Sequence, residues 1–301
     1  MKQIAFSYIR YFSLPVRRFV RNPMALIGLS LLTFFSLIAL FAPILAPPKY
    51  EFAPYRMPHK GYSTIPKPPN ANHIFGTTSG QYDIYYGIVW GSRTAFKTGL
   101  FVVLVASFIG VWVGIISGYY GGWIDEIIMR IVDIVWTIPS LILAMALVVS
   151  FGRGLDNIML ALALVSWRWY ARVIRSEVLK IKEMGYVHAA KIMGVSDFLI
   201  MLRHILPNTI YPIIIMGTLE MGSIVIMASF MSFIGLGAPK GYADWGQMVA
   251  LARNYIVGPP EAPLTYWYTI FFPGGCIILF VLAWNLIGDA LRDTFDPKNQ
   301  L

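Results

Sequence analysis

The chain has 301 residues, of which 57% are hydrophobic and only 13% are charged, and its formal net charge is +9. A typical soluble domain has roughly 25% charged residues, so this composition excludes an ordinary soluble protein. Many of the basic residues lie beside apolar stretches, which is how membrane proteins signal their orientation. The positive charge therefore indicates membrane insertion, and we expect no nucleic-acid partner.

Six apolar stretches approach the length that crosses a hydrocarbon core of roughly 30 Å. We therefore expect an all-α membrane protein with six transmembrane helices. The predicted spans are residues 25–45, 98–120, 131–151, 158–174, 209–236 and 266–287. The fourth span is the least apolar because Arg168 and Arg172 fall in its second half. Pro139 lies inside the third span, and residues 121–130 before it are expected to form a short turn.

These spans divide the chain into five predicted segments. Residues 1–24 form a basic cytoplasmic segment at the membrane surface, in which residues 4–12 are either a helix along the inner leaflet or a partly ordered tail. The remaining segments are a first transmembrane helix (25–45), an extracytoplasmic loop (46–94), a five-helix core (95–288) that contains a cytoplasmic loop at 175–208, and a cytoplasmic tail (289–301). The basic residues predict that both termini are cytoplasmic.

The loop between the fourth and fifth spans has the pattern of two short helices. Ala189, Ala190 and Gly194 place small residues about one turn apart, which lets another protein approach closely. Gly194 is expected to end the first helix, Ser196 to cap the second and Pro207 to stop it before the fifth span. Such a projection suits docking to a partner, although most cytoplasmic loops are only connectors.

Residues 186–208 resemble the "EAA" loop of permease subunits of ABC (ATP-binding cassette) importers. That pattern is Glu-Ala-Ala, three residues, Gly, nine residues and Ile-x-Leu-Pro. The matching positions are Ala189, Ala190, Gly194, Leu206 and Pro207. His188 replaces the glutamate and His204 the isoleucine, so a salt bridge made by that glutamate is not carried over. The resemblance implies that the loop couples this chain to an ATPase.

Further motifs extend the resemblance along nearly the whole chain. They lie at residues 18–23, 41–47, 138–140, 170–175, 232–237, 244–248, 272–274 and 285–297. Their order and spacing are similar to those of the C-type permease of the dipeptide, oligopeptide and nickel branch. This resemblance implies a type I ABC importer permease fold in the cytoplasmic (inner) membrane.

The resemblance also implies partners. These are a homologous second permease, two ATP-binding subunits and an extracytoplasmic solute-binding protein, with membrane lipid around the assembly. No Gly-x4-Gly-Lys-Ser/Thr phosphate-binding loop occurs in the sequence. We therefore expect a transport subunit and not an enzyme, without cofactors of its own, with ATP and Mg²⁺ held by the ATPase subunits.

The implied substrate is a di- or oligopeptide, and oligosaccharide import by the same machine is an alternative. Residues 75–83 depart from the branch pattern, because Thr78 replaces an aspartate and Gln81-Tyr82-Asp83 replaces Gly-Arg-Asp. The aromatic side chains that follow can form a belt at the membrane interface or contact a sugar. They are Tyr82, Tyr85, Tyr86 and Trp90.

Glu220 lies in the middle of the fifth span, where a carboxylate is costly. It is a candidate for the translocation path or the interface with the second permease, and a structural hydrogen bond is an equal alternative. An ion-coupled secondary transporter that uses Glu220 and Asp133 is a further alternative. His188 and His204 lack further ligands, so we expect no metal site.

Overall fold

The computed structural model describes residues 19–59, 61, 63–260 and 262–295. The predicted surface segment 4–12 lies outside them. The regular structure in the described part is helical, with β pairing limited there to four isolated bridges. The expectation of an all-α protein is confirmed.

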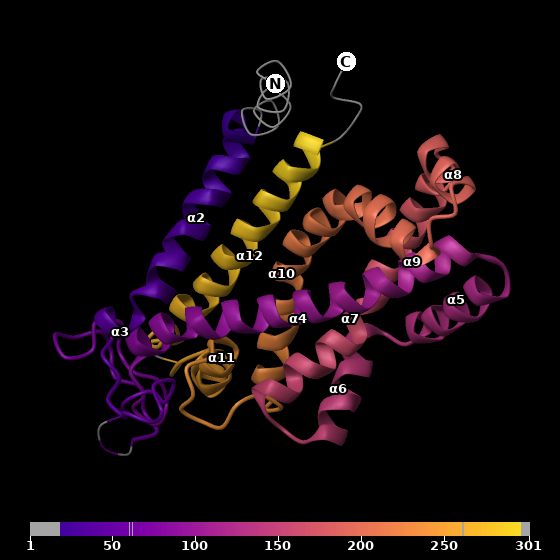
Figure 1. Cartoon of the computed structure of the whole chain (residues 1–301). Helices are drawn as coiled ribbons and strands as arrows, with labels where there is room; N and C mark the ends of the chain where they lie inside the picture. The colour runs from indigo at the N-terminus through magenta and orange to yellow at the C-terminus, as the bar shows by residue number, and fades with distance from the viewer. Residues whose placement is uncertain (1–18, 60, 62, 261, 296–301) are drawn as a thin grey trace.

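The first predicted span consists of two helices, α2 (Pro23–Leu40) and α3 (Ala42–Leu45). The Asn22 side chain caps α2 by accepting a hydrogen bond of 2.9 Å from the Met24 amide. α2 runs alongside α12 (Tyr268–Phe295) (Figure 1). Gly28 permits this approach, because a Cβ atom there would lie 2.9 Å from the Leu286 Cβ atom.

Helix α4 (Ile84–Tyr120) begins well before the predicted second span. Asp83 caps it, accepting a hydrogen bond of 2.9 Å from the Tyr86 amide. Its 37 residues measure about 55 Å at 1.5 Å per residue, which exceeds a hydrocarbon core. Residues 84–94, which were expected in the extracytoplasmic loop, are therefore helical.

The third predicted span is broken. Helix α5 (Gly122–Thr137) includes most of the expected turn at 121–130, and α6 (Ser140–Phe151) follows after a bend of 90°. Pro139 restricts the residue before it to extended backbone, and Ile138 has φ −93° and ψ 127°. Pro139 thus ends one helix and starts another, so the expected continuous span is wrong.

Helix α7 (Leu155–Ile181) runs parallel to α4 at close range. Gly110, Gly114 and Gly118 of α4 face it, and a Cβ atom on Gly114 would lie 2.6 Å from the Ala171 carbonyl oxygen. Small residues four apart commonly allow such packing between membrane helices.

The cytoplasmic loop contains helices α8 (Gly185–Ile192) and α9 (Asp197–Ile200). A π turn (Met201–Ile205) and a 3₁₀ turn (Leu206–Thr209) then connect α9 to α10 (Ile210–Phe233). Together they form a helical segment from Asp197 to Phe233. Pro207 therefore does not stop the second helix as predicted. Proline has no amide N–H to donate, and its ring crowds the preceding turn of an α-helix. The wider π turn before Pro207 leaves room for the ring and changes the hydrogen-bond pattern, so the helical segment continues.

Two loops form a cap at the opposite end of the bundle. The Met57 amide donates to the Gly241 carbonyl oxygen at 2.7 Å, and the Ala243 amide donates to that of Tyr55 at 2.8 Å. Helix α11 (Trp245–Ala252) follows, and the buried Asp244 caps it by accepting from the Gly246 amide at 3.0 Å. Burial raises the pKa of the Asp244 carboxyl above its ordinary value.

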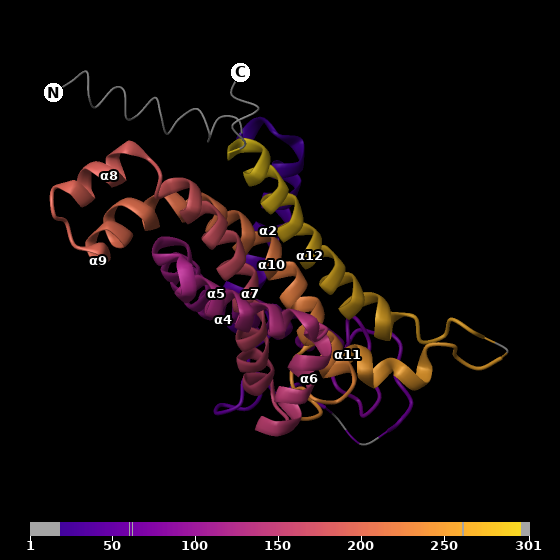
Figure 2. The same ribbon diagram turned by 90° about the vertical axis from the view of Figure 1, so that its right-hand side faces the viewer.

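The ends of the helices fall into two groups. Pro23 of α2, Phe295 of α12 and the α8–α9 pair lie at one end of the molecule, and the two capping loops lie at the other (Figures 1 and 2). Among the described residues, four helices are long and apolar enough to cross a membrane, or five if the bent α5–α6 pair is one span. The fourth predicted span forms part of α7, which is not in that set.

The position of α7 nevertheless fits a crossing. The Gly154 amide at its start donates to the Leu236 carbonyl oxygen beyond α10, and Lys182 at its other end donates to the Gly118 carbonyl oxygen near the end of α4. Its two ends thus lie near opposite ends of the bundle. The count of six spans stays a prediction.

Candidate functional site

The α8–α9 pair projects from the helical bundle (Figure 2). Its tip carries Ile192 and Met193, whose exposed fractions are 87% and 75%. Two large apolar side chains with so much exposure at the same turn are typical of a surface that another protein covers.

The small residues of α8 were predicted to form one packing face, but in the structure they do not. Ala190 is buried against the chain itself, whereas Ala189 and His188 are exposed. Gly194 ends α8 with a φ of 78°, and no atom lies within 4 Å of a Cβ atom placed there. Its positive φ, and not close packing, is what requires glycine at this turn. His188 is 3.6 Å from the Glu183 carboxylate.

The start of α9 differs from the prediction in its cap. Ser196 has the extended backbone of an N-cap, but its side chain makes no capping hydrogen bond. Further on, Leu206 is half-buried below α8, Pro207 is exposed, and the Asn208 side chain donates to the His204 carbonyl oxygen at 2.6 Å. These residues thus shape the connection to α10.

Two contacts attach α9 directly to α4. The Tyr119 hydroxyl donates to Asp197 Oδ1 at 2.6 Å, and the Trp112 ring stacks on the Phe198 ring with their centroids 6.3 Å apart. Tyr119 and Trp112 are not among the predicted site residues, because they belong to a distant apolar span. Their spacing of seven residues along a helix places them on one face, and is the signal that was available.

An ion pair reinforces the base of the loop. Arg175 of α7 donates to both carboxylate oxygens of Asp125 in α5, each at 2.5 Å, and the Ser117 hydroxyl of α4 also donates to this carboxylate. Two-pronged pairs of this kind fix geometry as well as charge. Helices α4, α5 and α7 are thereby held together where α7 leads into the loop.

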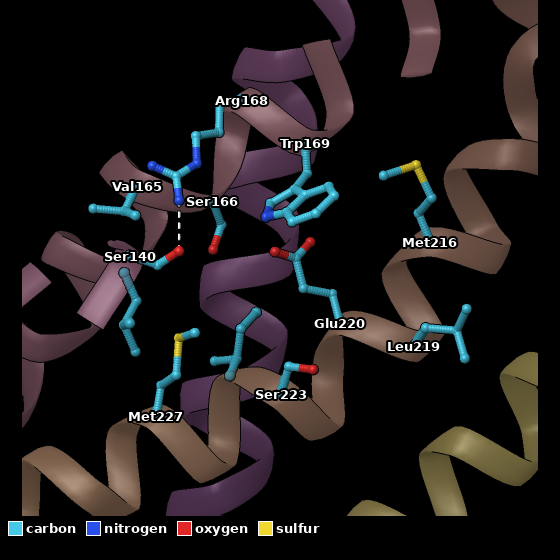
Figure 3. A pocket seen from close by; sticks show the side chains of 12 residues that line it. Ser140, Val165, Ser166, Arg168, Trp169, Met216, Leu219, Glu220, Ser223 and Met227 are labelled. Carbon is cyan, nitrogen blue, oxygen red and sulfur yellow. Dashed lines mark hydrogen bonds between the residues drawn. The ribbon is translucent and has the colours of Figure 1, made fainter. Parts of the chain in front are cut away.

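Glu220 lies in the wall of a cavity of about 430 Å³ (Figure 3). α10 and α7 supply most of the wall, and Ser140 at the start of α6 completes it. The hydroxyl groups of Ser166 and Tyr170 face the carboxylate. Even so, Glu220 Oε2 and the Tyr170 hydroxyl have no hydrogen-bond partner among the described residues.

Arg168 borders the same cavity, yet its guanidinium points to the α5–α6 bend (Figure 3). It donates to the Val135 carbonyl oxygen at 2.6 Å and to the Ser140 hydroxyl at 2.5 Å. The bend leaves carbonyl groups at the end of α5 without helical partners, and a cation at a helix C-terminus is favourable. Arg168 thus supports the broken helix.

Asp133 is paired with Arg172, and both side chains are about half exposed. It does not line the Glu220 cavity. The structure therefore does not bring together the two carboxylates that an ion-coupled mechanism would use.

The aromatic residues after the first loop bind backbone. Tyr86 donates its hydroxyl to the Pro54 carbonyl oxygen at 2.6 Å, Trp90 its indole N–H to that of Ala46 at 2.9 Å, and Tyr85 its hydroxyl to that of Leu45 at 3.2 Å. Tyr86 and Trp90 are buried. These two therefore contribute neither to a lipid-facing belt nor to an exposed sugar platform.

The departure at residues 78–83 lies in a buried turn of the cap. Thr78 and Gln81 are both buried, and Gln81 has a positive φ of 62°. The Gln81 side chain donates to the Ile65 carbonyl oxygen at 2.7 Å. Gln81 therefore stabilises the cap and does not offer an exposed contact to a solute.

The bundle, the broken helix and the projecting α8–α9 pair define a multi-pass membrane transport protein. Residues 110–300 match the family described as binding-protein-dependent transport system inner membrane component, and residues 10–69 match the N-terminal transmembrane domain of oligopeptide transport permease C. The chain belongs to this family: it is a permease subunit of an ABC importer, in the dipeptide and oligopeptide branch.

Several relatives support this family membership. The chain is 39% identical to a dipeptide transport system permease protein of Alkalihalophilus pseudofirmus, over 92% of this chain and 87% of the relative. It is 43% identical to a probable D,D-dipeptide transport system permease protein of Escherichia coli K12, over 77% and 75%. It is 36% identical to a glutathione transport system permease protein of Pectobacterium atrosepticum, over 94% and 89%.

Proposed function

We propose that this chain forms part of the path by which an ATP-driven importer moves di- or oligopeptides into the cell. The observation that carries the substrate class is the similarity, over most of the chain, to permeases named for dipeptides and glutathione. Oligosaccharides are less favoured, because Tyr86 and Trp90 are used inside the cap.

The assembly that we propose contains four kinds of chain. This permease pairs with a homologous second permease, and two ATP-binding subunits hold ATP and Mg²⁺ and carry out the hydrolysis. An extracytoplasmic solute-binding protein delivers the peptide to the loops that cap the other end of the bundle. The α8–α9 end, with both termini, faces the cytoplasm, and lipid surrounds the bundle.

The α8–α9 pair is the proposed contact with an ATPase subunit. The exposed Ile192 and Met193 would enter an apolar groove on that subunit. Movement of α9 would pass directly to α4 through Asp197 and Tyr119, and directly to α10 through the continuous helical segment from Asp197 to Phe233. ATP binding on the partner would thereby bias the bundle between its inward-open and outward-open states.

Copurification followed by reconstitution tests this proposal. The chain, expressed with the other subunits of its importer, should bring down a second permease and ATP-binding subunits. In liposomes with a peptide-loaded binding protein, uptake of labelled dialanine should require ATP. Uptake driven by an ion gradient without any ATPase subunit would instead support a secondary transporter.

A further inference from the structure

The Glu220 cavity combines one carboxylate with walls that are mostly apolar. The side chains that line it around the carboxylate include Ser166 and Trp169 of α7 and Met216, Ser223 and Met227 of α10 (Figure 3). Its volume of about 430 Å³ falls in the usual range for sites that hold small molecules.

The carboxylate of Glu220 has no cationic partner in the described part of the chain. No salt bridge joins it to a basic side chain there. The nearby Arg168 attracts the carboxylate electrostatically but donates its hydrogen bonds to the Val135 carbonyl oxygen and the Ser140 hydroxyl. Glu220 Oε2 is buried without a hydrogen-bond partner among the described residues, and such an unsatisfied acceptor is destabilising. A ligand that donates hydrogen bonds and carries positive charge would remove this cost.

The other walls suit the variable part of a peptide. Met216 and Met227 are flexible and polarisable, and methionine-rich surfaces accommodate ligands of different shapes. The indole of Trp169 lies beside the Glu220 carboxylate (Figure 3), and aromatic faces attract cations. The cavity thus offers one fixed feature, a negative charge, among adaptable surfaces.

We propose that Glu220 binds the terminal ammonium group of a peptide in transit, while the side chains of the peptide contact Met216, Met227 and Trp169. This inference rests on the proposed function, because the ammonium group is what peptides of different sequence have in common. The competing role for Glu220 is a purely structural contact with Ser166 and Tyr170.

Protection of a cysteine in the cavity from chemical labelling tests the proposal directly. Ser223 lines the same cavity one turn from Glu220, and the chain's single cysteine, Cys276, can be replaced by alanine. In the whole purified importer without binding protein, S223C in the C276A background should react with a maleimide. Millimolar dialanine should slow this reaction severalfold, and N-acetyl-dialanine at the same concentration should not.

Variants separate recognition from structure. E220Q should abolish the protection by dialanine, and E220D should retain part of it. The matched control is E126Q, which removes the same charge from an exposed side chain of α5 and should leave protection unchanged.

Three results would overturn the inference: equal protection by both peptides, protection that persists in E220Q, or a thiol that is unreactive or unprotected throughout. None of them would affect the proposed function, which is contradicted if the reconstituted wild-type importer takes up no dialanine with ATP and binding protein, or takes it up without an ATPase subunit.

Discussion

The guanidinium group of Arg168 lies inside a predicted span, where a charge is costly. Only 2% of the residue is exposed, and its two hydrogen bonds end at Val135 and Ser140 on either side of the α5–α6 bend. Arg168 makes the fourth predicted span less apolar, and its guanidinium stabilises the bend in the third predicted span. The sequence reveals the cost of this charge but not its partners.

Replacing Arg168 tests this assignment. R168M keeps much of the apolar volume and removes both hydrogen bonds, so we expect the unfolding free energy to fall by about 3 kcal/mol, at about 1.5–3 kcal/mol for each bond from a charged donor. Thermal unfolding of the purified importer in detergent measures the loss. R130M is the control, because the Arg130 side chain is exposed, and equal loss in both variants would contradict the assignment.

The buried carboxyl of Asp244 should make the stability of the folded protein depend on pH. Because burial raises the pKa of its carboxyl above the unfolded value of about 3.9, the unfolded state ionises first as the pH rises. The charge of Asp244 therefore reduces stability progressively above about pH 4. Asn caps a helix about as well as Asp, so D244N should be more stable than the wild type at pH 7.

The stability difference between D244N and the wild type should shrink as the pH falls toward 4, which melting curves across that range would show. D156N is the control, since the Asp156 side chain is 81% exposed. A difference that stays constant with pH would show that ionisation is not the cause.

At the scale of elements, proline and glycine determine where helices bend and end, although not always in the predicted way. Pro139 breaks a span that length and apolarity predict as continuous, and Pro207 is accommodated where a stop was predicted. The difference lies in the neighbours. Arg168 satisfies the broken backbone beside Pro139, whereas a π turn precedes Pro207.

The turn at Gly194 provides a prediction about coupling. A side chain at φ 78° costs about 1–2 kcal/mol for most residues, and Asn is among the few that visit this region routinely. G194V should therefore lower peptide uptake per ATP hydrolysed severalfold, and G194N should lower it much less. Reconstituted importer measures both rates.

G185A is the matched control for these variants, because Gly185 also has open space around it but has no positive φ. If G194N is as impaired as G194V, the partner subunit requires a bare backbone at this position. Unchanged uptake in G194V would count against the coupling role.

Across the whole molecule, the hydrogen bond between Tyr119 and Asp197 joins the cytoplasmic loop to α4. We expect Y119F to preserve assembly and ATP hydrolysis while reducing uptake, because α9 could then move without α4. D197N, which keeps an acceptor, should be milder. Y120F is the control on the adjacent, half-exposed tyrosine, and equal ATP-coupled uptake in Y119F and wild type would exclude this connection.

The class of protein and most of the helices can be predicted from the amino-acid sequence alone. Apolar length predicts membrane helices because the backbone must satisfy its own hydrogen bonds in lipid, and the motif at 186–208 indicates the partner-binding loop. The glycines at 110, 114 and 118 also carry a readable packing signal, although it does not say which helix they meet.

The roles of the polar side chains, in contrast, became visible in the folded structure. It assigned Arg168 to a bend, Arg175 to Asp125, and Tyr86 and Trp90 to the cap, while it left Glu220 facing a cavity. The physical reason is that apolar burial depends on local pattern, whereas a buried polar group depends on which distant atom it reaches. The hydrogen-bond partner of a buried polar side chain depends on how the helices pack, so it cannot be predicted from the local sequence pattern.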